Sequence, residues 1–526
     1  MLKFASRPFA CAAIFALLVV ATGGVVRAGQ SAVNPASKSQ ARKTTKKRKK
    51  ARHVAPLTIV LTPENVASPA PLPPAPSAPS STSAPLVGDI AVPTAPVPTA
   101  PAITRGGVSA SRSSGGVRIL PTGRPGGEAQ IAATSLVISE FRVRGPSGAN
   151  DEFVEIMNAS NADHTVAAAV TDGSGDGYAI VASDGITRCV IPNGTVIPAR
   201  GHFLCVNNTA FSLSSYPAGA GSVGSGDAQW TAGSGGDIPD NAGIALFNNS
   251  VGGANFSIGN RFDAVGSTAE ANALYKEGTG YPALTPFSID YAFYRDSCGK
   301  SGSIPTFGNC PAGGLLQDSN NNAADFIFVD TNGTSAGAGQ RLGAPGPEGL
   351  SSPIERNTTF TINLLDATVA AASPPNRVRD FTSDPANNST FGTLDIRRRI
   401  RNNTGGAVTR LRFRVIDITT FPAPSGIADM RPRTSTLVVV SGINDAATCL
   451  ASNGVATTPC TINVQGTTLE QPPSQPNGGG FNSSMSAGTV TLGTPIANGA
   501  SINLRFLLGL QQTGSFKFYF NVETLP

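Results

Sequence analysis

With 526 residues, of which 14% are charged, and with 59 glycines and 41 prolines, the chain is long enough for two to four domains. No long segment repeats apolar residues with a helical period, so the composition favours an all-β fold and excludes a helical bundle. The formal net charge of +6 is unevenly spread: residues 1–53 hold 12 lysines and arginines and no acidic residue, whereas residues 132–350 hold 9 basic and 20 acidic residues. The acidic region is therefore a poor candidate for direct nucleic-acid binding.

Residues 1–28 have the pattern of an export signal. Lys3 and Arg7 precede the apolar run 10–21, and small residues lead to a small-x-Ala cleavage site at 26–28. A membrane anchor is disfavoured because the run is shorter than the roughly 20 residues that span a bilayer. We therefore expect a secreted, periplasmic or cell-surface protein without a transmembrane segment after cleavage of the signal.

Two segments without the pattern of a folded domain follow. Residues 29–53 form a basic tail, which either tethers the protein to a polyanion or serves as a solvated spacer. The candidate polyanion-binding residues of the tail are Lys46, Lys47, Arg48, Lys49 and Lys50. Residues 54–131 are rich in proline, alanine, serine and glycine, which predicts a linker. We thus expect a disordered N-terminal region before the folded domains.

A predicted β-hairpin opens the first folded domain, which we place at 132–350. Its strands cover 136–144 and 151–158 and are joined by a turn-rich loop. Strict alternation places Ile138 and Glu140 on one face of the first strand. Because both faces are then largely apolar, we expect a central strand that is covered on both sides.

The two ends of this domain resemble the lamin tail domain family. The motif residues in the opening hairpin are Ile138, Glu140, Glu152, Phe153, Glu155 and Asn158. The closing part is also similar to the family, with SIDYAFYR at 288–295 and LGAPG at 342–346. The resemblance implies an immunoglobulin-like β-sandwich that binds proteins or nucleic acid, and that accompanies hydrolases in exported members. It implies a binding module and leaves the partner unnamed.

Cysteine spacing predicts disulfide bonds in an exported chain. Beyond Cys11 in the signal, six cysteines form three close pairs. Pairing of neighbours gives the bonds Cys189–Cys205, Cys298–Cys310 and Cys449–Cys460. Zinc is the disfavoured alternative, because no Cys-x-x-Cys occurs and the chain has 3 histidines.

Residues 351–526 predict a second β-sandwich, because short segments of this region alternate or run apolar between turns. Two of these segments, 394–400 and 410–415, alternate arginine with apolar residues. If they pair as a hairpin, one sheet face presents a ladder of arginines. The candidate residues are Arg397, Arg399, Arg410, Arg412 and Arg414. Such a ladder could bind acidic polymers, keep a strand face soluble or contact the acidic region 132–350.

Two further features suggest chemistry, and each also has a structural interpretation. Glu140 and Glu155 could act as acid and base in glycoside hydrolysis. Because both lie in apolar strands, we expect buried structural carboxylates that pair with Arg142 and Arg295. Trp230 could stack on a carbohydrate or anchor a loop.

A calcium-loop spacing occurs in a turn-rich segment. Asp172, Ser174 and Asp176 provide oxygen atoms at alternate positions, and residues 318–322 repeat the spacing. Neither is followed by a glutamate at the twelfth position, so ordered turns are favoured over calcium sites. We expect no other cofactor.

No nucleophile motif, phosphate-binding loop or dinucleotide fingerprint occurs in the chain. We therefore predict an exported, non-enzymatic binding or structural protein of the cell surface or envelope, whose partner is a protein or an acidic polymer. Two alternatives stay open. One is an exported hydrolase with an unrecognised active site in 351–526, and the other is a polyanion or nucleic-acid binder that acts through the basic tail.

Overall fold

The computed structural model describes residues 136–525, except residues 174, 220, 284–288, 298–315, 334–340, 424 and 471–477. The predicted signal, basic tail and linker, including Lys46 to Lys50, lie outside the described residues. Strands dominate the described part, and its helices are few and short, which confirms the all-β class. No helix in this part is long and apolar enough to cross a membrane.

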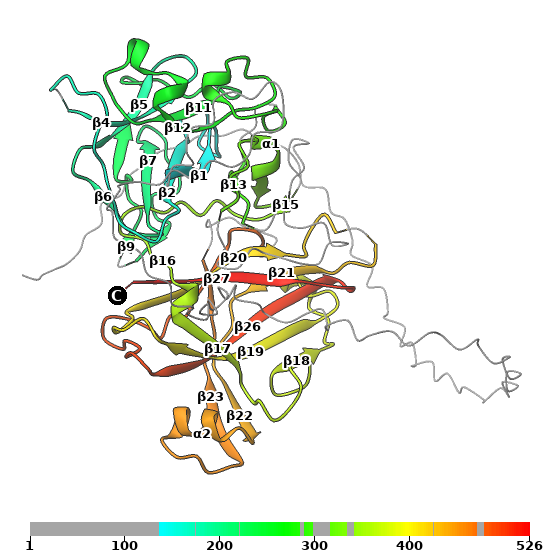
Figure 1. Ribbon diagram of the computed structural model, residues 1–526. Helices are drawn as coiled ribbons and strands as arrows, with labels where there is room; N and C mark the ends of the chain where they lie inside the picture. The colour runs from blue at the N-terminus through cyan, green and yellow to red at the C-terminus, as the bar shows by residue number, and fades with distance from the viewer. Residues whose placement is uncertain are drawn as a thin grey trace, which may run out of the picture. The chain divides into compact units, whose positions relative to one another are not determined.

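The first sandwich consists of two sheets (Figure 1). The larger sheet has the strand order β10-β7-β2-β1-β13-β14-β15. Its strands are β1 (Leu136–Arg142), β2 (Phe153–Asn158), β7 (His202–Asn207), β10 (Ala228–Trp230), β13 (Tyr291–Arg295), β14 (Phe326–Asp330) and β15 (Arg341–Leu342). The smaller sheet has the order β12-β11-β4-β5, with β4 (Gly177–Ala182), β5 (Thr187–Pro192), β11 (Ile244–Phe247) and β12 (Arg261–Val265).

Short elements fill the connections of this sandwich. β3 (His164–Thr165) pairs with β6 (Val196–Ile197), and β8 (Pro217–Ala218) pairs with β9 (Gly221–Ser222). The helices are η1 (Gly253–Asn255), η2 (Ile258–Asn260), η3 (Ala273–Tyr275) and α1 (Asn322–Asp325).

Apolar side chains from both sheets form the core of the first sandwich. Ile138 of β1 and Phe293 of β13 pack with Leu246 of β11, and all three are buried. Each such side chain stabilises the fold by about 1.5–3 kcal/mol relative to exposure. The disulfide bond Cys189–Cys205 joins β5 of the smaller sheet to β7 of the larger one, as the spacing predicted.

Trp230 belongs to the same core. Its side chain is buried, and its Nε1 donates a hydrogen bond to the carbonyl of Gly236 at 2.9 Å. The residue is therefore a loop anchor and not an exposed platform for a sugar ring.

A β-bulge at Ser139 changes the faces of β1. β1 and β2 pair antiparallel as predicted, but the register shifts between Ile138 and Glu140. Phe141 consequently joins Ile138 in the core between the sheets, while Glu140 lines a cavity on the opposite face. Strict alternation wrongly placed Ile138 and Glu140 on one face, because a bulge inserts an extra residue. β1 is nonetheless central and buried, as expected.

The second sandwich also consists of two sheets. One has the order β16-β27-β20-β25-β24, with β16 (Ile354–Glu355), β20 (Arg410–Ile418), β24 (Thr468–Glu470), β25 (Ser484–Ser486) and β27 (Phe518–Leu525). The other has the order β17-β19-β26-β21, with β17 (Phe360–Leu364), β19 (Thr393–Asn402), β21 (Asp429–Arg433) and β26 (Ser501–Gln512), and β18 (Arg377–Asp380) also pairs with β19. The helices η5 (Asn357–Thr359) and η6 (Pro385–Asn387) lie in the connections.

The predicted arginine hairpin does not form, because β19 and β20 belong to different sheets. Ile396 and Ile400 of β19 and Leu411 and Phe413 of β20 enter one core from the two sheets. Placing the strands in facing sheets lets each bury its apolar side against the other. Their arginine sides therefore lie on separate sheets, and no continuous ladder exists.

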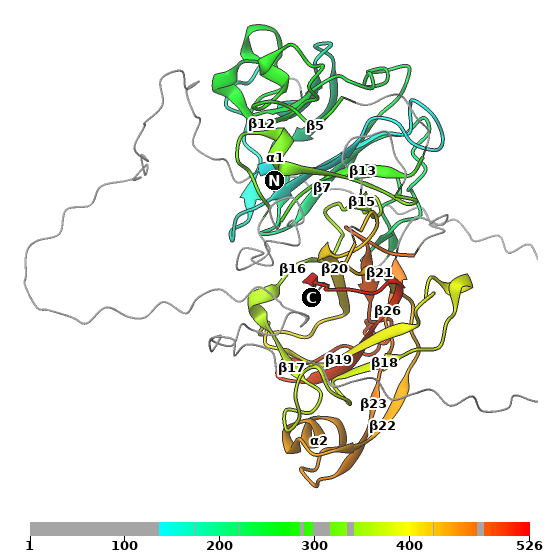
Figure 2. The same ribbon diagram turned by 90° about the vertical axis from the view of Figure 1, so that its right-hand side faces the viewer.

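A small unit accompanies the second sandwich. It consists of β22 (Val438–Ile443), α2 (Ala446–Asn453) and β23 (Cys460–Val464), which lie together in both views (Figures 1 and 2). The bond Cys449–Cys460 joins α2 to β23 and confirms a second predicted pair. Cys298 and Cys310 lie outside the described residues.

A continuous apolar core links the two sandwiches. It contains Phe413 and Phe520 of the second sandwich together with Leu204 and Tyr294 of the larger sheet of the first. Both sandwiches accordingly belong to one compact unit of the chain. The larger sheet is thus covered on both faces, and polar residues of β1 and β2 that face the second sandwich are buried.

Candidate functional site

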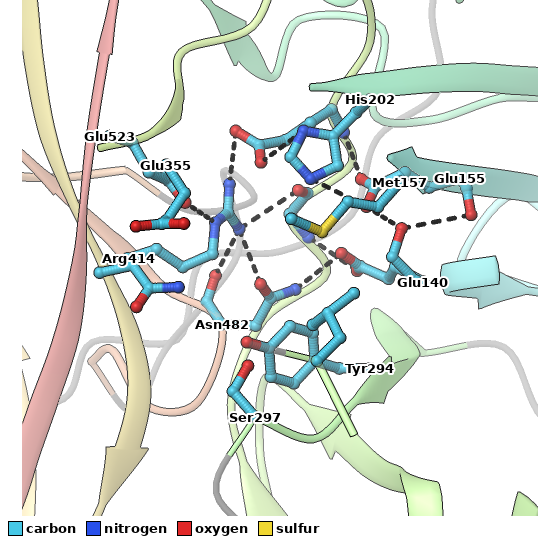
Figure 3. Close-up of a pocket in the computed structure, with 15 residues that line it drawn as sticks. Glu140, Glu155, Met157, His202, Tyr294, Ser297, Glu355, Arg414, Asn482 and Glu523 are labelled. Atoms are coloured by element: carbon cyan, nitrogen blue, oxygen red, sulfur yellow. Dashed lines mark hydrogen bonds and ion pairs between the residues drawn. The ribbon is translucent and has the colours of Figure 1, made fainter. Parts of the chain in front are cut away.

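Buried charged side chains gather where β1, β2 and β7 meet β20 and β27 (Figure 3). All of them except Arg412 line a cavity of about 30 Å³. We call this set the interface cluster, and its members are Glu140, Glu155, His202, Glu348, Arg412, Arg414 and Glu523. None of the seven is more than 7% exposed. Burial of so many charges is tolerated only if each finds partners.

The bulge at Ser139 sets Glu140 opposite Glu155 in the β1–β2 ladder. The carboxylate of Glu140 accepts a hydrogen bond from the backbone N–H of Gly346 at 2.9 Å. It also accepts one from the side-chain amide of Asn482 at 2.8 Å. Glu140 therefore binds a segment of each sandwich.

Glu155 is held in a similar way. Its carboxylate accepts hydrogen bonds from the hydroxyl of Ser139 and, at 2.7 Å, from the backbone N–H of Glu348. Burial raises the pKa of Glu140 to about 7, and burial together with the charge of Glu140 raises the pKa of Glu155. At neutral pH the pair therefore retains proton occupancy and does not carry two full charges.

Two arginines of β20 bind acidic groups from both sandwiches. Glu523 of β27 lies 2.7 Å from Nε of Arg412 and 2.8 Å from Nε of Arg414. Glu348, which follows β15, pairs with Arg412 and lies 2.8 Å from Arg414. Burial opposes ionisation of Glu523, but Arg414 and Arg412 outweigh it and lower the pKa of this carboxyl. The ion pairs thus join the sandwiches through charge-assisted bonds.

His202 lies between two carboxylates of the cluster (Figure 3). Its Nδ1 is 3.5 Å from Glu348 and its Nε2 is 3.8 Å from Glu155, which is longer than a good hydrogen bond. Burial lowers the pKa of His202 to about 3. The imidazole is therefore neutral, and its pKa is far from the value near 7 that suits a general base.

The geometry of the interface cluster fits a clamp better than an active site. A cavity of about 30 Å³ has room for one or two water molecules and none for a sugar ring. The carboxylates already accept hydrogen bonds from the chain itself. Carboxylates of the described residues that lie close enough together to share a metal ion occur elsewhere, at Asp263, Glu277 and Asp318.

Glu140 and Glu155 are buried as expected, but the partners expected for them were wrong. Arg142 pairs with Asp151 instead. Arg295 pairs with three aspartates of its own sandwich. The glutamates face the second sandwich, so their partners come from a region far away in the sequence.

The other motif residues support the first sandwich. Glu152 accepts hydrogen bonds from the amide of Asn207 at 2.7 Å and from the backbone N–H of Ile238 at 2.6 Å. Asn158 donates to three backbone carbonyls. Phe153 is buried in the core that links the sandwiches. All of these residues fasten loops or fill the core.

The arginines of β20 all contact groups of the chain itself, and among them only the side chain of Arg410 is partly exposed, at 22%. Arg412 and Arg414 are buried, and Arg410 donates to the carbonyl of Gly219 at 2.7 Å and pairs with Glu470. Their contacts with Glu348 and Gly219 confirm, for this strand, the expected contact with the acidic region 132–350. Arg397 and Arg399 lie on the other sheet and are considered below.

The segment with calcium-loop spacing forms a turn. The carboxylate of Asp176 accepts hydrogen bonds from the backbone N–H groups of Asp172, at 3.0 Å, and Gly173, at 3.2 Å. Both oxygens of Asp176 therefore face backbone donors, as in turns stabilised by aspartate. Ser174 lies outside the described residues. This geometry favours the turn interpretation.

Sequence reasoning missed most partners in the interface cluster. Glu523 had a signal, because Phe520 and Val522 alternate with polar residues in the segment that leads to it. Glu348 and Asn482 had none. Their roles depend on contacts between segments that are distant in the sequence.

Neither a family model, a curated protein sequence nor a solved structure matches the chain. The function proposed below therefore rests on the residues of this chain and on the lamin-tail resemblance.

Proposed function

We propose that this chain is an exported, non-enzymatic binding protein of the cell surface or envelope, and that it binds an acidic polymer through an arginine-rich face of its second sandwich. The lamin-tail-like domain acts in this proposal as an interaction module clamped to the second sandwich. The resemblance supports a binding role, and the size of the buried cavity argues against catalysis there.

The arginine face carries the proposal. It consists of Arg397, Arg399 and Arg401 of β19 and Arg505 of β26. Arg401 is exposed and Arg399 is partly exposed, and the side chains of Arg397 and Arg505 are each 13% exposed. The first three occupy alternate positions of one strand, so their side chains repeat about every 7 Å along one face.

The positive charge of this face is only partly neutralised. Asp395 lies 2.8 Å from Arg397 and 3.0 Å from Arg505. These two arginines are direct cross-strand neighbours, an arrangement that destabilises a sheet unless an anion lies between them. Arg399 and Arg401 have no ion-pair partner among the described residues. Guanidinium groups with free donors bind carboxylates and sulfates bidentately, so an acidic polysaccharide suits this face.

Charge reversal in the full chain tests the proposal. Arg399→Glu with Arg401→Glu should weaken the affinity for polygalacturonate at least tenfold at low salt, because two attractive contacts become repulsive. Arg356→Glu reverses a partly exposed arginine that belongs to neither β19 nor β26, and it should change the affinity less than twofold. Binding should also weaken as salt screens the charges. Equal affinity of the double variant and the wild type would contradict the proposal.

The basic tail is tested in the same assay. Replacing Lys46, Lys47, Arg48, Lys49 and Lys50 with glutamine in the full chain should leave the effect of the Arg399/Arg401 reversal intact. If these replacements alone abolish binding while the reversal has no effect, the polymer binds through the tail. Release of shorter fragments from the polymer during the assay would overturn the non-enzymatic role.

A further inference from the structure

Three carboxylates converge in the first sandwich, away from the interface cluster. They belong to Asp263 of β12, Glu277 just after η3, and Asp318 just before α1. One carboxylate oxygen from each lies within 4.8 Å of the corresponding oxygens of the other two. Three segments that are distant in the sequence thus deliver like charges to one point, which costs free energy unless a cation is nearby.

Glu277 supplies an independent observation. The residue is 6% exposed. Its Oε1 is paired with Arg261 at 3.1 Å, whereas its Oε2 is buried without a hydrogen-bond partner among the described residues. A buried carboxylate oxygen without a partner is costly and is explained by a bound water molecule or ion. This oxygen belongs to the side chain that faces Asp263 and Asp318.

The charges around this point do not balance. Four carboxylates surround it, those of Asp263, Glu277, Asp318 and Asp325. Two guanidinium groups pair with them: Arg295 contacts the three aspartates, and Arg261 contacts Glu277. If all four carboxylates are ionised, the formal charge is −2, which one divalent cation would neutralise. Without a cation, burial raises the pKa of Glu277 to about 9 and also raises the pKa of Asp263.

The available oxygens suit calcium. Asp263 already accepts hydrogen bonds from the backbone N–H groups of Ile138 and Ala264, so it has limited capacity left. Glu277 has a free Oε2, and the side chain of Asp318 is 28% exposed, which leaves a path for the ion and for water. Ca²⁺ takes oxygen ligands in flexible geometry and accepts water in its shell. Mg²⁺ demands a more regular octahedron.

We propose that Asp263, Glu277 and Asp318 form a calcium site that ties β12, the segment after η3 and the segment before α1 together. The site differs from the spacing motif at 172–176, where both carboxylate oxygens of Asp176 accept hydrogen bonds from backbone N–H groups. Of the segment 318–322, which repeats the calcium-loop spacing, only Asp318 belongs to the proposed site. That segment therefore does not bind the ion as a calcium loop.

Calcium titration of the full chain, first treated with EDTA, tests the proposal. Calorimetry should detect binding of Ca²⁺ alone, and the midpoint of thermal unfolding should rise with its concentration. Absence of both signals at about 10 mM Ca²⁺, roughly ten times the weakest dissociation constants of extracellular calcium modules, would overturn the site. Binding of Mg²⁺ but not Ca²⁺ would overturn its assignment to calcium.

Matched variants locate the ion. Glu277→Gln and Asp318→Asn should each weaken Ca²⁺ binding at least tenfold, whereas Asp172→Asn with Asp176→Asn should leave it unchanged. Glu277→Gln keeps the shape of the side chain, and Asp318 is partly exposed, so both variants should show the wild-type circular dichroism spectrum in EDTA. Loss of binding in the Asp172/Asp176 variant alone would place calcium at the turn and contradict the proposal.

Discussion

Three buried glutamates of the interface cluster, Glu140, Glu155 and Glu523, differ in the direction of their pKa shifts. Glu523 lies against two arginines and stays ionised although it is buried. Glu140 and Glu155 lie opposite each other and hold protons more tightly than exposed glutamates do. Buried glutamates around one cavity thus shift in opposite directions, because burial always favours the neutral form and only a close cation reverses it.

Glu140→Gln should reduce the pH dependence of stability. The pKa of Glu140 is about 7 in the folded protein and 4.5 ordinarily, so the folded state holds a proton that the unfolded chain releases. The stability from this proton is fully present below pH 4.5 and is lost as pH rises through 7, by about 3 kcal/mol. In urea unfolding, the stability of the variant relative to wild type should therefore increase by up to about that amount between pH 5 and pH 8. A constant difference over this range would contradict the assignment.

Glu523→Ala should lower the free energy of unfolding by about 3–5 kcal/mol, because it removes one of the two carboxylates that the buried guanidinium groups of Arg412 and Arg414 share. Asp384→Ala provides the contrast, since Asp384 is 41% exposed and 3.8 Å from Arg433. Exposed pairs contribute about 0–1 kcal/mol. Urea unfolding at pH 7 measures both. Equal effects of the two substitutions would show that the buried ion pairs of Glu523 contribute no more to stability than an exposed pair.

Strands could be located from the sequence more reliably than they could be paired. Alternation of apolar residues located β1, β2, β19 and β20 and gave the correct pairing for the first two. It failed at Ser139, because a bulge has no signature in alternation, and it failed for β19 and β20. A short connection with alternating strands fits a hairpin and a crossover between facing sheets equally well. Only the shared core decides between them.

The two described disulfide bonds act on different elements, so their removal should have different effects. Cys189→Ala with Cys205→Ala should lower the free energy of global unfolding by about 2–4 kcal/mol, because this bond joins the two sheets of a sandwich. Cys449→Ala with Cys460→Ala should mainly increase hydrogen exchange in α2 and β23, which have a small core of their own. If both variants lost the same amount of hydrogen-exchange protection across the larger sheet, the result would contradict this division.

At the scale of the whole molecule, the candidate site could be predicted only in part. The resemblance and the apolar context identified Glu140 and Glu155 as buried structural residues. Their partners Gly346, Glu348 and Asn482 are up to 342 positions away, and no local pattern brings them together. The proposed calcium site was missed for the same reason, since its three carboxylates come from separate segments.

The two sandwiches should unfold as one unit, because they share an apolar core and the interface cluster. The chain has 1 tryptophan, Trp230, which reports on the first sandwich. Arg414→Ala, in the second sandwich, removes contacts to Glu348 and the carbonyl of Gly346. It should lower the urea midpoint of the tryptophan fluorescence transition. The corresponding loss in the free energy of unfolding should be about 3 kcal/mol.

Arg399→Ala is the matched control, because this arginine belongs to the same sandwich and lies on the sheet away from the interface cluster. It should leave the tryptophan midpoint unchanged. Circular dichroism should follow the same single transition as fluorescence in every variant, as expected for one cooperative unit. If Arg414→Ala shifts only the circular dichroism and not the fluorescence, the sandwiches unfold independently, and the interface cluster contributes no coupling between them.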